Sequence, residues 1–243
     1  MATPDPPKMR LDLHCHSEAS ADCVTPLSSF PARCRARGIR VQAITDHNEV
    51  WGAQKLKEMV MSSGAGDLTI IVGEEVSTRE GEIVGLFLTE KIPAGLSPEE
   101  TVAAIKGQGG LVLLPHGFDP LKRHRLKPEA LERVKDSIDI VEVFNARISR
   151  RKWNLAGSTW AATHGKPESA GSDAHTVKDI GSAWVEAPRR EITTPQDLLE
   201  VLSDTASEVG GEWTHPAVAL VYKGWTFALD GVRRVASRLV TSS

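Results

Sequence analysis

The side chains of Asp12, His14 and His16 recur at every second position near the start of the chain, with Leu13 and Cys15 between them. Because successive side chains of a β-strand point to opposite faces, a strand here would present both imidazoles on one face. Paired imidazoles are common ligands of divalent metal ions. A His-x-His pair alone is also compatible with two histidines satisfied by backbone hydrogen bonds, so other ligands must decide.

The same residue types recur where other predicted strands end. These positions are Asp46-His47, Glu74-Glu75, Pro115-His116, Asn145 with Arg147, and Asp173 with His175. Five of the eight histidines follow strand ends in this way. In a closed barrel those ends meet on one face, which is where barrel enzymes build their sites. Imidazole and carboxylate ligands without thiolate favour a site for several Zn, Mn or Fe ions.

The elements that must position these residues follow from the alternation of short β-branched runs with amphipathic stretches. This alternation predicts βα units around a mostly parallel sheet. Strands are expected near residues 11–16, 39–45, 68–76, 83–88, 111–115, 138–144, 167–172 and 182–187. Helices are expected near 27–37, 101–108, 129–136 and 196–203, each with a proline close to its start. Pro31 predicts an irregular first helix, since proline removes a backbone hydrogen bond.

Length and composition restrict the class of protein. A chain of 243 residues is long enough for one large α/β domain. The net charge of -3 gives no reason to expect duplex DNA as a partner. Three cysteines, an odd number near the N-terminus, favour reduced thiols. The sequence lacks both a signal peptide and an apolar stretch of membrane-spanning length, so we expect a cytoplasmic protein with no membrane partner.

The motifs of the chain resemble those of one known family. In order they are His-x-His-Ser-x-x-Ser-x-Asp, Thr-Asp-His-Asn, Gly-x-Glu-x-Ser, Pro-His, Glu-Val-Phe-Asn and Gly-Ser-Asp-Ala-His. From Leu11 to about Glu186 this set resembles the polymerase and histidinol phosphatase (PHP) family of metal-dependent phosphoesterases. It is most similar to the small stand-alone bacterial members that dephosphorylate nucleotides or trim RNA 5′ ends. The resemblance implies a distorted (β/α)7 barrel, TIM-like and a single domain, with two or three divalent ions.

The barrel is expected to span residues 9–205. Residues 206–243 are expected to form a helical segment that closes the barrel and is not a separate domain. Arg233, Arg234 and Arg238 would lie on one side of that segment. A membrane-surface or partner helix is the alternative interpretation.

The resemblance also implies a set of metal ligands, which are His14, His16, Asp22, His47, Glu75, His116, Asp173 and His175. Glu75 would bridge a first ion, held with His14, His16 and Asp173, to a second ion held with His116. Asp22, His47 and His175 would hold a third ion. The position of Asp22 depends on aligning a turn whose length varies in the family.

Two departures from the family pattern leave one ligand open. No histidine occurs in Gly81-Glu82-Ile83-Val84, and Gly117 rather than proline follows His116. The third ligand of the second ion is expected to be Glu142 or Asn145. Asp46 is expected to orient a ligand histidine from behind or to bind an ion itself. Glu74 is expected on the opposite strand face from Glu75, as a surface or helix-contact carboxylate.

The expected activity is hydrolysis of a phosphate ester in a nucleotide, a nucleoside bisphosphate or a short oligonucleotide. A hydroxide that bridges two ions would attack phosphorus, with Glu75 and Asp173 holding the ions. Arg147 is the third expected catalytic residue, because a guanidinium can bind the developing negative charge. Arg123 and Arg125 lie in a basic loop after His116 and are expected to bind substrate, although a solvated loop is equally compatible.

Three alternatives stay open at the level of the sequence. A histidinol-phosphatase-like enzyme would act on another small phosphorylated molecule. An amidohydrolase would need a carboxylated lysine at a strand end, and no lysine stands there. A noncatalytic metal-binding regulatory module would lack ligands, whereas the set here is nearly complete.

Overall fold

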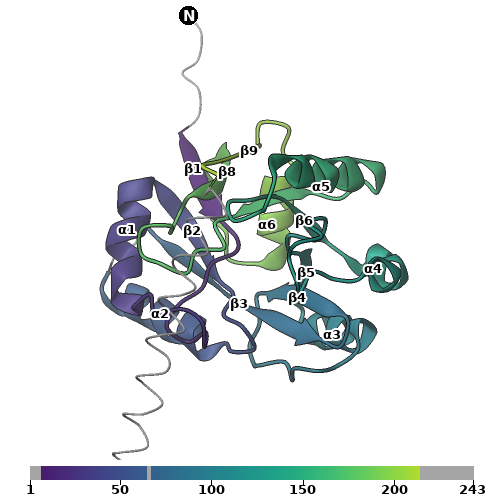
Figure 1. The fold of residues 1–243 in the computed structure, drawn as a ribbon. Helices are drawn as coiled ribbons and strands as arrows, with labels where there is room; N and C mark the ends of the chain where they lie inside the picture. Colours follow the sequence, from purple (N-terminus) through teal and green to yellow (C-terminus); the bar gives the residue numbers. More distant parts are fainter. Residues whose placement is uncertain (1–6, 65–66, 214–243) are drawn as a thin grey trace, which may run out of the picture.

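A mixed sheet of nine strands is the frame of the computed structural model, which describes residues 7–64 and 67–213 (Figure 1). The strands are β1 (Lys8–Asp12), β2 (Ile39–Ile44), β3 (Thr69–Thr78), β4 (Gly81–Leu86), β5 (Leu111–Leu114), β6 (Ile140–Asn145), β7 (Glu168–Gly171), β8 (Ala183–Pro188) and β9 (Glu208–Gly211). Their order across the sheet is β7-β6-β5-β4-β3-β2-β1-β8-β9. The sheet curves until its two ends nearly meet, so the expected α/β barrel is confirmed, with more strands than seven.

Strand directions depart from the mostly parallel sheet that was expected. The pairs β1–β2, β2–β3, β5–β6 and β6–β7 are parallel, whereas both neighbours of β4 and both neighbours of β8 are antiparallel to it. β3 and β4 are joined by only two residues, Arg79 and Glu80, and such a short connection permits only an antiparallel hairpin. The hairpin therefore replaces one of the βα units.

The first strand and the residues that follow it contact opposite ends of the sheet, and this closes the barrel. Its first part pairs with β8, from Lys8 to Leu11. Beyond β1 the chain turns to β7: the N–H of Leu13 donates to the carbonyl of Ala170 at 3.1 Å. Cys15 and Ala174 then form an isolated parallel bridge. We call these contacts of residues 13–16 with residues 170–174 the seam of the barrel.

The seam corrects one expectation about the first strand. β1 ends at Asp12, so His14 and His16 stand on the extended segment that follows it rather than within a strand. The Asp12 carboxylate accepts hydrogen bonds from the N–H of Ser172 at 2.9 Å and of Gly181 at 3.2 Å. Asp12 thus fastens the seam and does not join the two histidines in binding an ion.

Six α-helices complete the described fold: α1 (Phe30–Arg37), α2 (Trp51–Ser62), α3 (Pro98–Gly107), α4 (Pro128–Val134), α5 (Arg151–Thr163) and α6 (Pro195–Leu202). Helices α1 to α5 lie around the outside of the sheet (Figure 1), and their apolar faces form one buried cluster with its outer face. Leu198, Val201 and Leu202 of α6 belong instead to a second cluster with the inward side chains of the strands. Capping boxes begin α3 and α6, at Ser97 and Thr194.

The predicted elements are mostly confirmed. All eight predicted strands and all four predicted helices are present, whereas β9, α2 and α5 were not predicted. The first helix is irregular as expected, with a 3₁₀ turn at Leu27–Ser29 before Pro31 enters α1. At the start of the segment 206–243, which was expected to be helical, Glu208–Gly211 pairs with β8 as a strand. The rest of that segment, residues 214–243, lies outside the described residues.

Two smaller expectations concern cysteines and membrane helices. Cys15, Cys23 and Cys34 are buried and free. No helix in residues 7–64 and 67–213 has both the length and the apolar character needed to cross a bilayer.

Candidate metal centre

One buried carboxylate, that of Glu75 on β3, lies among four imidazoles. Its Oε2 is 3.3 Å from Nε2 of His14, 3.4 Å from Nε2 of His16 and 3.2 Å from Nδ1 of His47. Its Oε1 is 2.9 Å from Nε2 of His116. The four histidines come from segments that follow β1, β2 and β5, so the barrel brings together residues from distant parts of the sequence. Glu75 thus has the geometry of a carboxylate that bridges two ions.

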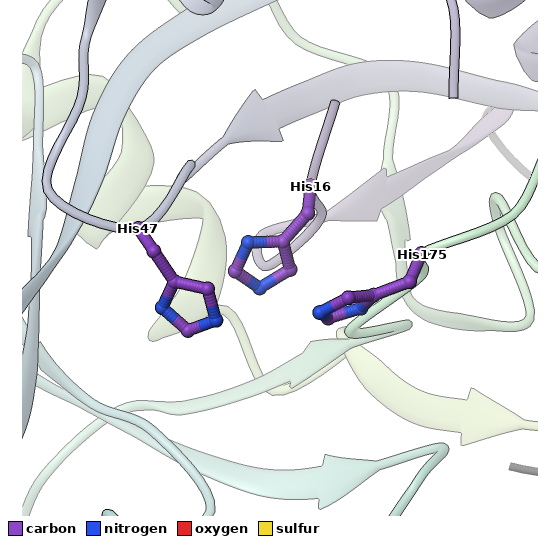
Figure 2. A group of neighbouring side chains, drawn as sticks. All are labelled: His16, His47 and His175. Atoms are coloured by element: carbon purple, nitrogen blue, oxygen red, sulfur yellow. The ribbon is translucent and has the colours of Figure 1, made fainter. Parts of the chain in front are cut away.

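Three imidazoles form a second group beside Glu75, and their rings converge on one point (Figure 2). The ring centroid of His16 is 4.5 Å from that of His47 and 4.3 Å from that of His175. Asp22 closes the group, with Oδ2 at 3.2 Å from Nε2 of His175 and Oδ1 at 3.8 Å from Nε2 of His47. The structure therefore brings Asp22 together with His47 and His175.

Asp173 connects the cluster to two cations. Its Oδ1 is 3.5 Å from Nε2 of His16, and its carboxylate forms ion pairs with Lys122 and Arg147. Burial alone would raise the pKa of Asp173, but Lys122 and Arg147 outweigh burial and hold this pKa well below its usual value. Asp173 has a φ of 50° and His116 a φ of 28°, a region that non-glycine residues seldom adopt. Backbone strain of this kind is typical of functional sites.

The donor set fits divalent metal ions. Three groups bring their ligand atoms within 4.8 Å of one another: His14 with His16 and Glu75, His16 with His47 and His175, and His47 with Glu75 and Glu82. Burial, together with the imidazoles of His175 and His47, lowers the pKa of His16 to about 3, so this ring is neutral, as a metal ligand must be. The buried Oδ1 of Asp22 has no hydrogen-bond partner in the described structure.

Glu82 joins the cluster although the sequence did not identify it. This buried carboxylate on β4 lies 3.7 Å from Nδ1 of His47 and 3.9 Å from Nε2 of His116. Burial, followed by the negative charges of Glu75 and Asp173, raises the pKa of Glu82 to about 9. A carboxylate in such surroundings calls for a nearby cation. Glu75 pairs with Val84 in the hairpin, and Glu82 shares the face of Val84. A prediction of this short turn from the sequence would have located Glu82.

The residues expected either to bind an ion or to support its ligands fall in the supporting role. Oε1 of Glu142 is 3.0 Å from Nδ1 of His14, and Oε2 accepts the N–H of His116 at 2.6 Å. Asn145 donates to Oε2 of Glu142 at 3.0 Å and to Oδ2 of Asp173 at 3.3 Å. A carboxylate behind a ligand histidine fixes the tautomer and the direction of its ring. Glu142 therefore orients the ring of His14 and holds the main chain at His116.

The Asp46 carboxylate accepts hydrogen bonds from two serines. Its Oδ1 accepts the hydroxyl of Ser20 at 2.9 Å, and the same hydroxyl lies 3.1 Å from Nδ1 of His16. Ser17 occupies the other carboxylate oxygen of Asp46 through its hydroxyl at 2.7 Å. The expected orienting role thus has a physical route, from Asp46 through Ser20 to the His16 ring.

Glu74 lies on the opposite face of β3, as expected, but it is buried rather than a surface residue. Its Oε2 accepts the N–H of Ile92 at 2.8 Å. Burial raises the pKa of Glu74 to about 7. The two adjacent glutamates thus differ completely in their surroundings.

The cluster opens into a cavity of about 590 Å³ at the ends of the strands. Arg147 and Arg123 line this cavity with Lys122, whose approach to Asp173 the sequence did not predict. A smaller hollow of about 190 Å³ adjoins it, lined by Arg125 and Arg79. Ser77, Glu82, Arg123 and His124 line both spaces. Arg123 therefore lines the cavity of the cluster itself, whereas Arg125 lines only the adjoining hollow.

Comparison with known protein families gives two matches along the chain. A sequence model described as PHP domain matches residues 12–138, and one described as PHP-associated matches residues 151–214. An uncharacterised protein of Methanocaldococcus jannaschii is 36% identical over 193 residues, covering 78% of this chain and 75% of that protein.

Two solved structures share the fold. One is a two-domain protein of Bacteroides vulgatus that contains a predicted PHP-like metal-dependent phosphoesterase. It has a TM-score of 0.65 and 17% identity, and the match covers 87% of this chain and 68% of that one. The other is a predicted metal-dependent phosphoesterase of Bifidobacterium adolescentis, with a TM-score of 0.60 and 20% identity over 82% of this chain and 97% of that one. At these identities the likeness concerns the fold alone.

Proposed function

Because this chain belongs to the PHP domain family, we propose that it is a metal-dependent phosphoesterase that uses two or three Mn, Zn or Fe ions. The single observation that carries the proposal is the Glu75 carboxylate with imidazoles on both of its oxygens. When bound, the ions would lower the pKa of a coordinated water and would neutralise charge on the phosphoryl oxygens. We also propose that residues 9–205 make up the PHP-type barrel.

The residues that would hold the ions follow from the three groups of donors. His14, His16, Glu75 and Asp173 would hold the first ion, and Glu75 would also contact the second, with His116. Glu82 is the proposed further ligand of the second ion, in place of Glu142 and Asn145, which serve as supports. Asp22, His47 and His175 would hold a third ion. Compared with a site made of imidazoles alone, a site that includes the Glu82 carboxylate is better suited to Mn or Fe, since harder cations prefer oxygen ligands.

The cavity supports a small phosphorylated substrate such as a nucleotide, a nucleoside bisphosphate or a short oligonucleotide. Arg147 would bind a phosphoryl oxygen, because it lines the cavity and its charge lies beside Asp173 at the edge of the donor groups. The adjoining hollow with Arg123 and Arg125 would take a second anionic group of the same substrate. We do not expect duplex DNA or membranes as partners, because the cavity is only about 590 Å³ and the chain has a net charge of -3.

The proposal is tested by phosphate release. Purified protein supplied with Mn²⁺ is expected to hydrolyse an aryl phosphate ester, to lose the activity in EDTA and to regain it when Mn²⁺ is restored. A panel of nucleotide monophosphates, nucleoside bisphosphates and histidinol phosphate separates the nucleotide hypothesis from the histidinol-phosphatase alternative. Ion binding without hydrolysis of any ester would instead favour the noncatalytic regulatory module.

The adjoining hollow makes a second prediction about the two arginines. Arg123→Ala and Arg125→Ala are each expected to raise KM for a nucleoside bisphosphate about tenfold, the size of one lost charge-assisted hydrogen bond. KM for the corresponding monophosphate should change little. Arg190→Ala is the control, since this exposed arginine pairs with Asp204 away from the cavity. Equal effects on both substrates would mean that the loop is only solvated.

A further inference from the structure

We propose that Asp119 is a positioning residue that holds Lys122 and Arg147 together beside the metal centre, where both cations bind the phosphoryl oxygens of the substrate. The inference rests on the proposed phosphoesterase function and adds Lys122 and Asp119 to its machinery. Three features of the described structure support it: the contacts of the Asp119 carboxylate, the paths of two loops, and the balance of charge around the donor groups.

The Asp119 carboxylate fastens two loops to each other. Its Oδ1 accepts the N–H of Leu121 at 2.9 Å and the hydroxyl of Ser149 at 2.7 Å, and its Oδ2 accepts the N–H of Ser149 at 2.6 Å. The carbonyl of Asp119 also accepts the N–H of Lys122 at 3.1 Å. Asp119 is 1% exposed, so these hydrogen bonds are shielded from water and from competing partners. Two loops, one after β5 and one after β6, are thus joined through this carboxylate.

Each of the two loops carries one cation to the same carboxylate. Lys122, three positions after Asp119, donates from Nζ to Oδ2 of Asp173. Arg147, two positions before Ser149, lies with Nη1 3.6 Å from Oδ1 of Asp173. The side chains of Lys122 and Arg147 keep 22% and 12% of their surfaces exposed, so both remain accessible from the cavity. The Asp119 link sets the separation of these two charges.

Charge balance explains why such a pair is needed. Asp22, Glu75, Glu82 and Asp173 carry four carboxylates toward the donor groups, so two divalent ions would only neutralise them, and a third ion would leave a small net positive charge. A phosphate ester adds further negative charge, which protein cations have to meet. Lys122 and Arg147, on one side of the centre, supply this positive charge. Because their side chains are already held in place, substrate binding does not carry the entropy cost of ordering them. Asp119 does not line the cavity, so it acts on the cavity through the two loops that it joins.

The test measures binding of inorganic phosphate to the Mn²⁺-loaded protein by calorimetry, which does not depend on turnover. Asp119→Asn places an amide nitrogen against at least one of the three donors, which are the N–H of Leu121 and the hydroxyl and N–H of Ser149. We expect this variant to bind phosphate about tenfold more weakly, with its manganese content unchanged. In a chain that already carries Lys122→Ala and Arg147→Ala, the same substitution is expected to weaken it by less than about twofold. Asp139→Asn is the control, since this carboxylate also accepts a main-chain N–H, from Val112 at 2.7 Å, but lies outside the cavity.

Three outcomes would overturn the proposal. The first is that Asp119→Asn binds phosphate as tightly as the wild-type protein. The second is that Asp119→Asn weakens binding as much in the chain that lacks Lys122 and Arg147 as in the chain that keeps them. The third is that Asp139→Asn weakens binding as much as Asp119→Asn does. If Asp119→Asn does not fold, Ser149→Ala replaces it, because this substitution removes only one of the three hydrogen bonds. Ser149→Ala should weaken phosphate binding severalfold. An unchanged affinity would also overturn the proposal. If wild-type protein hydrolyses phosphate esters while these variants fail to behave as expected, only the Asp119 inference falls. If wild-type protein neither binds phosphate nor hydrolyses esters, the proposed function itself falls.

Discussion

Glu75→Gln is expected to lower kcat/KM for an aryl phosphate by about 10³-fold, on the order of 4 kcal/mol of transition-state stabilisation. The Glu75 carboxylate is the group that contacts His14, His16, His47 and His116 together. An amide keeps the shape of the side chain but loses the charge and one acceptor oxygen, so it cannot bridge two ions. Manganese bound per chain, measured by elemental analysis after gel filtration, should fall in parallel with the activity.

The neighbouring residue provides a matched control for this experiment. Glu74→Gln makes the same chemical change one position away, on the opposite face of β3. Because burial already raises the pKa of Glu74 to about 7, the neutral amide is expected to be tolerated, with activity and manganese content near those of the unchanged chain. If both substitutions lowered activity equally, the effect would come from β3 as a whole and not from a bridging carboxylate.

Gly171→Ala is expected to have the second-largest effect, through packing rather than charge. A Cβ at this position would lie 2.2 Å from Oε1 of Glu142 and 2.3 Å from Cβ of His14. Both neighbours are buried and hydrogen-bonded to each other, so neither can move without turning the His14 ring. We expect a loss of about 2 to 3 kcal/mol in the free energy of unfolding, typical of a methyl group forced into a packed interior, and weaker binding of manganese.

The measurement is urea denaturation in EDTA, which separates the packing effect from ion binding, followed by manganese titration of the folded protein. Gly107→Ala is the control, since a Cβ there meets nothing within 4 Å and Gly107 lies in helix α3. It is expected to leave stability unchanged or to raise it slightly, because alanine is the better helix former. Equal stability of the two variants would show that the space beside His14 can adapt.

The strand ends could be read from the sequence because periodicity and a parallel sheet together determine which residues share a face. That argument located His47, Glu75 and His116, but it assumed parallel neighbours throughout. Glu82 was missed because it enters the centre from the antiparallel strand β4, near the start of the strand rather than its end. The two-residue turn before it was the available signal.

Lys122 was missed for a different reason. Its loop reads as a solvated run of charge, and nothing local predicts that one lysine of several turns inward to Asp173. We propose that Lys122 is directed inward by the pairing of Asp119 with Ser149, a contact between loops 30 residues apart in the chain. Such contacts depend on how neighbouring loops pack, and sequence periodicity carries no information about them. The supporting roles of Glu142 and Asn145 likewise became clear only from their hydrogen-bond partners.

The seam of the barrel has a consequence for the supply of metal. His14 and His16 stand on one side of the Cys15–Ala174 bridge, while Asp173 and His175 stand on the other. Ions held by both sides would act as a latch between the first strand and the seventh. Ligands that bind only the closed form add to its stability by an amount set by their free concentration. Without the ions, only hydrogen bonds such as those of Leu13 with Ala170 and of Asp12 with Ser172 would hold the seam, so metal binding would make barrel closure more stable.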